Sequence, residues 1–162
     1  MGSGKTSIGK LLSKKSGLPL IDSDKFIEEK ENCTITDLFE TKGDDYFRSK
    51  ERDFCLTIKD YPPHIISTGG GIILSSQNRD LIKRTGKVFY LHTSPTVLAK
   101  RLKHSKKRPL LNKGNKFLIF KDLYNKRHRY YQETAHHVIH CNRRTFSDIG
   151  ELILSIAFNS HP

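Results

Sequence analysis

Apolar and polar positions along this chain follow two alternating patterns. Short apolar runs, which are typical of buried strands, are separated by longer segments whose apolar residues recur at helical spacing. The strands predicted from these runs cover residues 18–21, 64–67, 87–92 and 136–140. Strands that alternate with helices predict an α/β fold, with a parallel sheet and helices on both of its faces.

The predicted helices begin at recognisable start signals. Ser94-Pro95 combines an N-cap serine with a proline at the first helical position. Thr34 and Asp37 have the spacing of a capping box. The helices are predicted over residues 5–15, 23–30, 35–41, 44–60, 75–83, 96–103, 116–134 and 146–158.

Length and composition indicate one domain without a membrane segment. We expect a single domain over all 162 residues, which is long enough to bury a core. No stretch approaches the roughly 18 consecutive apolar residues of a membrane span, and no signal peptide is recognisable. Cys33, Cys55 and Cys141 are isolated and odd in number, which argues against a disulfide framework or a zinc site. A cytoplasmic protein is therefore predicted.

The formal net charge of +12 raises nucleic acid as a partner. The basic residues are dispersed along the chain, however, and are densest at 103–108 and 126–129. We find neither aromatic platforms nor a recognition helix, and a highly anionic substrate pair accounts for part of the charge. No nucleic-acid partner is expected.

The chain opens with Gly2-Ser3-Gly4-Lys5-Thr6, the second half of the phosphate-binding pattern G-x-x-x-x-G-K-[ST]. Glycines let backbone N–H groups turn inward around an anion, and the following helix adds its positive N-terminal dipole. Two alternatives are a chance or expression-derived Gly/Ser run and the myristoylation pattern M-G-x-x-x-[ST]. The apolar periodicity that follows favours nucleotide binding.

The first glycine of this pattern, and the apolar strand that normally delivers such a loop, would precede Met1. Such a strand lies centrally in a parallel sheet and is buried on both faces. We therefore expect a sheet of five strands in which the first strand is missing from this chain.

Asp22-Ser23-Asp24 directly follows the first predicted strand, at the carboxyl edge where open parallel sheets bind ligands. One carboxylate could hold Mg²⁺ while the other accepts a proton from a substrate hydroxyl. The alternative is simple capping of the next helix by Asp22 or Ser23.

Three further segments carry candidate chemistry. Arg48 lies in a predicted helix, where the alternative is a surface salt bridge. Thr68-Gly69-Gly70-Gly71 follows a predicted strand, and its glycines allow a ligand to approach the backbone N–H groups closely. Residues 103–113 are basic, lack an apolar stripe and contain Pro109, so we predict a nucleotide lid rather than a plain connection.

Together and in this order, these residues resemble the shikimate kinase family over residues 1 to about 158. The matching segments are Gly2-Ser3-Gly4-Lys5-Thr6, Asp22-Ser23-Asp24, Phe47-Arg48, Gly69-Gly70-Gly71, Arg108-Pro109-Leu110-Leu111, Arg127 with the residues that follow it, and Asn142-Arg143-Arg144. The resemblance implies a P-loop kinase fold and transfer of phosphate from ATP to the 3-hydroxyl of shikimate. This reaction belongs to chorismate and aromatic amino-acid biosynthesis.

On the nucleotide side, the resemblance implies that Lys5 binds phosphate, that Thr6 and Asp22 lie at Mg²⁺, and that Arg108 is a lid arginine on the transferring phosphate. The residues implied to contact ATP are Gly2, Ser3, Gly4, Lys5, Thr6, Arg101, Arg108 and Arg144. Arg101 and Arg144 resemble residues that line an adenine pocket.

On the substrate side, the resemblance implies that Asp24 meets the reacting hydroxyl of shikimate. Arg48 and Arg127 resemble a clamp on the shikimate carboxylate, and Gly70 and Gly71 would offer backbone N–H groups. We expect a monomer that binds ATP and shikimate. The alternatives are a kinase for another small hydroxy acid such as gluconate and a truncated, catalytically impaired binding module.

Overall fold

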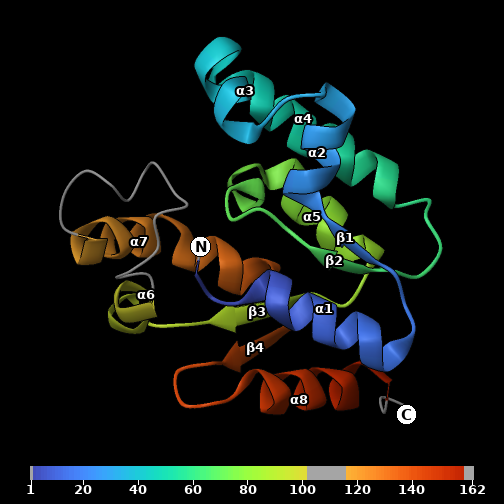
Figure 1. Ribbon diagram of the computed structural model, residues 1–162, viewed down its shortest axis with the longest axis vertical. Coiled ribbons are helices and arrows are strands. Elements are labelled where there is room, and N and C mark those ends of the chain that lie inside the picture. Colours follow the sequence, from blue (N-terminus) through green and yellow to red (C-terminus); the bar gives the residue numbers. More distant parts are fainter. Residues whose placement is uncertain (1, 102–115, 159–162) are drawn as a thin grey trace.

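Four strands form at the apolar runs that predicted them. The computed structural model describes residues 2–101 and 116–158 (Figure 1). The strands are β1 (Leu20–Asp22), β2 (Ile65–Ser67), β3 (Phe89–His92) and β4 (His137–His140). Each begins one or two residues later than predicted. The predicted α/β fold with parallel strands is confirmed.

The strands pair in two separate parallel ladders. In the first, Leu20 of β1 lies opposite Ile65 of β2, and in the second, Phe89 of β3 lies opposite His137 of β4. No ladder joins the two pairs within the described residues. A cavity of about 630 Å³ is lined by both β2 and β3. Ile66 of β2 lines this cavity and keeps 37% of its surface exposed.

The predicted helices all form, and their described ends differ from the predicted ones by at most two residues. They are α1 (Lys5–Ser16), α2 (Ser23–Glu31), α3 (Ile35–Thr41), α4 (Gly43–Ile58), α5 (Ser76–Thr85), α6 (Pro95–Arg101), α7 (Lys116–Thr134) and α8 (Phe146–Phe158). A short 3₁₀ helix, η1 (Ile72–Leu74), was not predicted. None of the helices in the described residues has the length and apolar composition needed to cross a membrane.

The helix N-termini are capped in different ways. Asp22, Thr34 and Ser75 each accept a backbone N–H with their side chains, at the starts of α2, α3 and α5. Thr34 and Asp37 form the predicted capping box. By contrast, α1 and α4 start without a side-chain cap. The first turn of α4 contains Asp44 and Asp45, whereas that of α1, which starts after Gly4, has no acidic residue.

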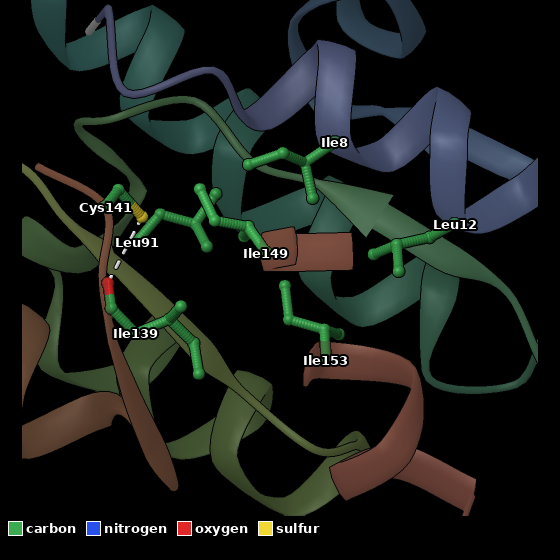
Figure 2. Packing of buried hydrophobic residues seen from close by; sticks show 7 residues of the cluster. All are labelled: Ile8, Leu12, Leu91, Ile139, Cys141, Ile149 and Ile153. Atoms are coloured by element: carbon green, nitrogen blue, oxygen red, sulfur yellow. Dashed lines mark hydrogen bonds between the residues drawn. The ribbon is translucent and has the colours of Figure 1, made fainter. Parts of the chain in front are cut away.

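Buried side chains form one cluster around β3 and β4 and two smaller clusters elsewhere in the fold. The first packs α1 and α8 against these strands (Figure 2), and its members are Ile8, Leu12, Leu91, Ile139, Cys141, Ile149 and Ile153. Each fully buried aliphatic side chain of this kind contributes about 1.5–3 kcal/mol. The second cluster centres on Phe54 and Ile72, and the third on Leu38 and Phe47. Figure 1 shows α3 at one end of the molecule and α8 at the other.

Candidate active site

The loop before α1 has the backbone that its glycines predict. Gly2 and Gly4 both have positive φ, 75° and 88°, a region that other residues rarely adopt. A Cβ at Gly4 would also lie 2.7 Å from the ring of Phe146 on α8. The N–H of Ile8 donates to the Gly4 carbonyl at 2.9 Å, so the first helical turn closes directly after the loop. The helix therefore begins with backbone N–H groups that no capping side chain takes up.

Thr6 and Asp22 come from different segments and meet at this helix end. The Thr6 hydroxyl donates to Asp22 Oδ2 at 3.1 Å. The other oxygen, Oδ1, accepts the backbone N–H of Asp24 at 3.2 Å and so caps α2. Asp22 therefore caps α2, as the capping interpretation expected, and also contacts the first turn of α1. Within the described residues, no group of three or more His, Cys, Asp or Glu side chains could hold a metal by itself.

Asp24 lies against the triple-glycine turn that follows β2. A Cβ added to Gly69 would collide with Asp24 Oδ1, so only glycine permits this approach. The buried Ser23 hydroxyl accepts the Gly69 N–H at 2.7 Å and fixes the turn to the start of α2. The carboxylate of Asp24 is therefore held beside the backbone of the turn.

Arg48 reaches the same turn from α4. A Cβ added to Gly71 would collide with its guanidinium. Arg48 bonds Glu51 at 2.6 Å through Nη1 and Asp44 at 3.0 Å through Nη2. Burial acts to lower the pKa of Arg48, but the bonds to Glu51 and Asp44 raise the pKa on balance. Arg48 is therefore a permanent cation at the turn, and it has more N–H donors than these contacts use.

Arg127 reaches the turn from α7. Its Nη1 donates to the Gly70 carbonyl at 3.2 Å, and the Tyr131 hydroxyl donates to the same oxygen at 2.6 Å. Arg48 and Arg127, which are far apart in the sequence, thus adjoin consecutive glycines. The arrangement places two positive charges and two carboxylates, those of Asp24 and Glu51, around a single backbone turn.

The salt bridge that the sequence allowed for Arg48 does form, but its partner, Glu51, is not at the surface: it is 1% exposed. Burial raises the pKa of Glu51, and the charge of Arg48 opposes that shift. Its second oxygen, Oε1, has no hydrogen-bond partner in the described part of the chain. The i,i+3 spacing from Arg48 indicates the pairing but not the burial of Glu51.

Sequence reasoning missed Asn78 and Arg79. The buried Asn78 donates to the Ile72 carbonyl at 3.2 Å, and Arg79 donates to the Ile73 carbonyl at 2.8 Å. Both residues lie on α5 and hold η1, the segment that continues the triple-glycine turn. The sequence carries no specific signal for these bonds, because the carbonyls that they satisfy belong to an unpredicted 3₁₀ helix.

The cavity between the strand pairs extends to these groups. Its lining includes Ser3 and Lys5 near the start of α1, Gly70 of the triple-glycine turn and Arg127 of α7. The predicted phosphate loop and the triple-glycine turn therefore open onto one common space.

Some predicted residues are not brought into this cluster. Arg108 and the predicted lid over 103–113 lie outside the described residues, as does the side chain of Arg101. Arg144 is exposed in the turn before α8, near Asp148, whose pKa is lowered chiefly by its hydrogen bonds to Thr145 and slightly by Arg144.

Comparison with known proteins gives a consistent result. The family described as shikimate kinase matches residues 1–157. A shikimate kinase of Sulfurihydrogenibium sp. is 39% identical over 155 residues, covering 96% of this chain and 92% of that protein. The solved shikimate kinase from Acinetobacter baumannii in complex with shikimate has a TM-score of 0.90 at 34% identity, covering 98% of this chain and 89% of that one. A gluconokinase from Sinorhizobium meliloti, at 18% identity and a TM-score of 0.53, shares the fold alone.

Proposed function

The chain belongs to the shikimate kinase family, and we propose that it transfers the γ-phosphate of ATP to the 3-hydroxyl of shikimate in the cleft between the phosphate loop and the triple-glycine turn. One observation carries the assignment of the substrate side. Asp24, Arg48 and Arg127 come from three different helices and converge on Gly69–Gly71. A small acid with one carboxylate and neighbouring hydroxyls suits that set of groups.

The phosphates of ATP bind at the start of α1. The uncapped N–H groups there, together with the positive end of the helix dipole, suit an anion. Gly2, Ser3 and Gly4 supply the loop, and Lys5 neutralises phosphate oxygens. The absence of acidic residues from the first turn of α1 supports this role, because a carboxylate there would repel the phosphates.

Mg²⁺ binds beside Thr6 and Asp22. The two side chains lie 3.1 Å apart and present only oxygen ligands, which this cation prefers. Mg²⁺ usually keeps several waters and takes few protein ligands, so a site without a larger acidic cluster fits it. When bound, the ion would draw charge from the phosphate oxygens.

Shikimate binds with its carboxylate between Arg48 and Arg127. Arginine is suited to this contact because its planar guanidinium can meet a carboxylate with two parallel hydrogen bonds. Gly70 and Gly71 offer backbone N–H groups from the turn between the two arginines. The 3-hydroxyl then lies at Asp24, which is held against the same turn.

Phosphoryl transfer requires positioning and charge neutralisation more than covalent catalysis. Asp24 orients the 3-hydroxyl and accepts its proton as the oxygen forms a bond to the γ-phosphorus. The bond from that phosphorus to the bridging oxygen of ADP breaks, and ADP leaves with the bonding electrons. Arg108 is proposed to neutralise the transferring group from the lid, and Arg101 and Arg144 to line the adenine pocket.

We further propose that the enzyme works as a monomer in a reducing cytoplasm. All three cysteines lie in the described residues as free thiols, which supports a reducing compartment.

A coupled assay of ADP release tests the reaction. We expect Mg²⁺-dependent turnover with ATP and shikimate, and none with gluconate or a nucleoside monophosphate. A 3-deoxy analogue of shikimate is the matched control, because it keeps the carboxylate and lacks the attacking oxygen. Turnover with gluconate and not with shikimate would refute the proposal, and binding of both ligands without turnover would favour a binding module.

A further inference from the structure

The carbonyl oxygen of Gly70 accepts two hydrogen bonds from α7. Arg127 donates one at 3.2 Å and the Tyr131 hydroxyl donates the other at 2.6 Å. The two residues are four apart on the helix, so both side chains project from the same face. Arg127 has a proposed role in the carboxylate clamp, whereas Tyr131 has none.

The Gly70–Gly71 peptide connects the hydrogen bonds from α7 to the proposed substrate site, because its carbonyl accepts them and its N–H belongs to Gly71. No peptide in the described residues is cis, and in a planar trans peptide the C=O and N–H bonds point in opposite directions. Drawing the Gly70 carbonyl toward α7 therefore turns the Gly71 N–H away from α7. Arg48 packs against Gly71 and Arg127 bonds the Gly70 carbonyl, so this peptide touches both arginines of the proposed clamp.

Tyr131 is better suited than Arg127 to hold this peptide permanently. Its ring stacks on Tyr90 of β3, with 5.0 Å between the ring centroids and 23° between the planes. Burial raises the pKa of Tyr131, so its hydroxyl keeps the proton that it donates. If Arg127 turns to bind a carboxylate, its N–H donors no longer all point at Gly70. Tyr131 has a single hydroxyl hydrogen to donate and only two side-chain torsions, so its bond to Gly70 is easier to keep.

We propose that Tyr131 is a positioning residue of the shikimate site, whose hydroxyl holds the Gly70–Gly71 peptide so that the Gly71 N–H faces the substrate carboxylate. The proposal rests on the proposed clamp of Arg48 and Arg127. Tyr131 itself does not touch the substrate. It keeps one backbone donor aligned while Arg127 exchanges its bond to Gly70 for one to the ligand.

The test compares Tyr131→Phe with Tyr130→Phe by equilibrium titration of shikimate. Tyr131→Phe keeps the ring that stacks on Tyr90 and removes only the hydroxyl. We expect shikimate to bind about three- to tenfold more weakly, the range for one lost hydrogen bond. ATP affinity and the thermal midpoint should change little. Tyr130, whose ring lies 4.5 Å from the Arg79 guanidinium, is the matched control and should show no loss.

A second ligand separates positioning from general support of the fold. In this analogue a hydroxymethyl group replaces the carboxylate of shikimate, and Tyr131→Phe should weaken its binding far less. Equal losses for both ligands, or no loss for either, would overturn the proposal. Arg48→Ala titrated in parallel reports on the clamp itself. If that variant binds shikimate normally, the proposed clamp fails; if it binds weakly while Tyr131→Phe binds normally, only the role of Tyr131 fails.

Discussion

The chain has two glycine-rich turns that face one cavity, and they are held in different ways. The turn at Gly69–Gly71 is bonded by side chains: Ser23 accepts the Gly69 N–H, and Arg127 and Tyr131 donate to the Gly70 carbonyl. The loop at residues 2–6 passes into α1 through a left-handed Gly4 that has no side-chain cap.

The difference follows from what each turn is proposed to bind. Phosphate oxygens can themselves accept the open N–H groups of a helix end, so a side-chain cap on α1 would compete with the ligand. Capping residues do stand at the starts of α2, α3 and α5, which shows that the chain uses them elsewhere. Shikimate carries one carboxylate and so offers less negative charge than the phosphates of ATP. The hydrogen bonds at Gly69–Gly71 therefore hold the donors of the turn in place before the ligand binds.

The largest expected effect comes from adding a strand directly before the phosphate loop, as β2 directly precedes the triple-glycine turn. An apolar, Val/Ile-rich strand ending in glycine, fused ahead of Gly2, should enter the cavity of about 630 Å³ between β2 and β3. Two buried aliphatic side chains alone would contribute about 3–6 kcal/mol. In a domain of this size, each kcal/mol shifts the thermal midpoint by about 2–4 °C.

Calorimetry and the ADP-release assay check this prediction together. The strand form should melt several degrees higher and turn over faster, because its loop holds the phosphates more firmly. A Gly/Ser-rich extension of equal length is the control. Equal midpoints and rates for both extensions would show that the cavity does not accept a strand.

Lys5→Met should affect only the phosphate side. Removing one group that stabilises transition-state charge typically lowers kcat by about 10²–10³-fold. Lys10→Met, at an exposed position on the same helix, should leave kcat unchanged. Titration of shikimate should give the same dissociation constant for both variants, and a parallel loss of shikimate affinity would remove the distinction between the two turns.

Arg48→Ala should weaken the binding of shikimate and leave the binding of ATP unchanged. Loss of a charged hydrogen bond costs about 1.5–3 kcal/mol, or roughly ten- to hundredfold in shikimate affinity, while ATP affinity stays the same. The change also leaves the buried Glu51 without its partner, which is destabilising in itself. The double variant Arg48→Ala/Glu51→Gln separates the two effects.

Titration calorimetry measures both ligands on each form, and Arg52→Ala on the exposed side of α4 is the control. If the double variant regains shikimate affinity, Arg48 acts only by neutralising Glu51. If ATP binding falls equally, Arg48 supports the whole fold rather than the clamp.

How much the sequence predicts depends on the range of the interaction. Helix boundaries, the Thr34 capping box and the joining of Asp24 to the triple-glycine turn were predictable, because they follow from local signals and from the shared carboxyl edge of parallel strands. Tyr131 was not, because its partner, Gly70, lies 61 residues away. Its aromatic ring alone predicts only a buried position.

The separation of the strands into two ladders agrees with the gap that the sequence predicted at the place of a central strand. The apolar runs at β2 and β3 predict buried strands equally well, but they do not predict which strand edges pair.

The predicted lid over 103–113, including the role of Arg108, stays a prediction, since these residues lie outside the described chain.

The smallest expected effect comes from removing the side-chain cap of α3. This helix start is capped by the protein itself, whereas the start of α1 is proposed to be capped by the phosphates of ATP. At the start of α3, the Thr34 hydroxyl accepts the Asp37 N–H at 3.2 Å, and the Asp37 carboxylate accepts the Thr34 N–H at 3.2 Å. Thr34→Ala removes the first bond and should cost about 1 kcal/mol, lowering the thermal midpoint by about 2–4 °C. ATP binds the folded state only, so it should raise the midpoints of the variant and the unmodified chain by equal amounts. Thr34→Ser, which keeps the hydroxyl, is the control. A smaller rise with ATP in Thr34→Ala alone would mean that the cap on α3 also supports the phosphate loop, and the two kinds of helix end would then not be independent.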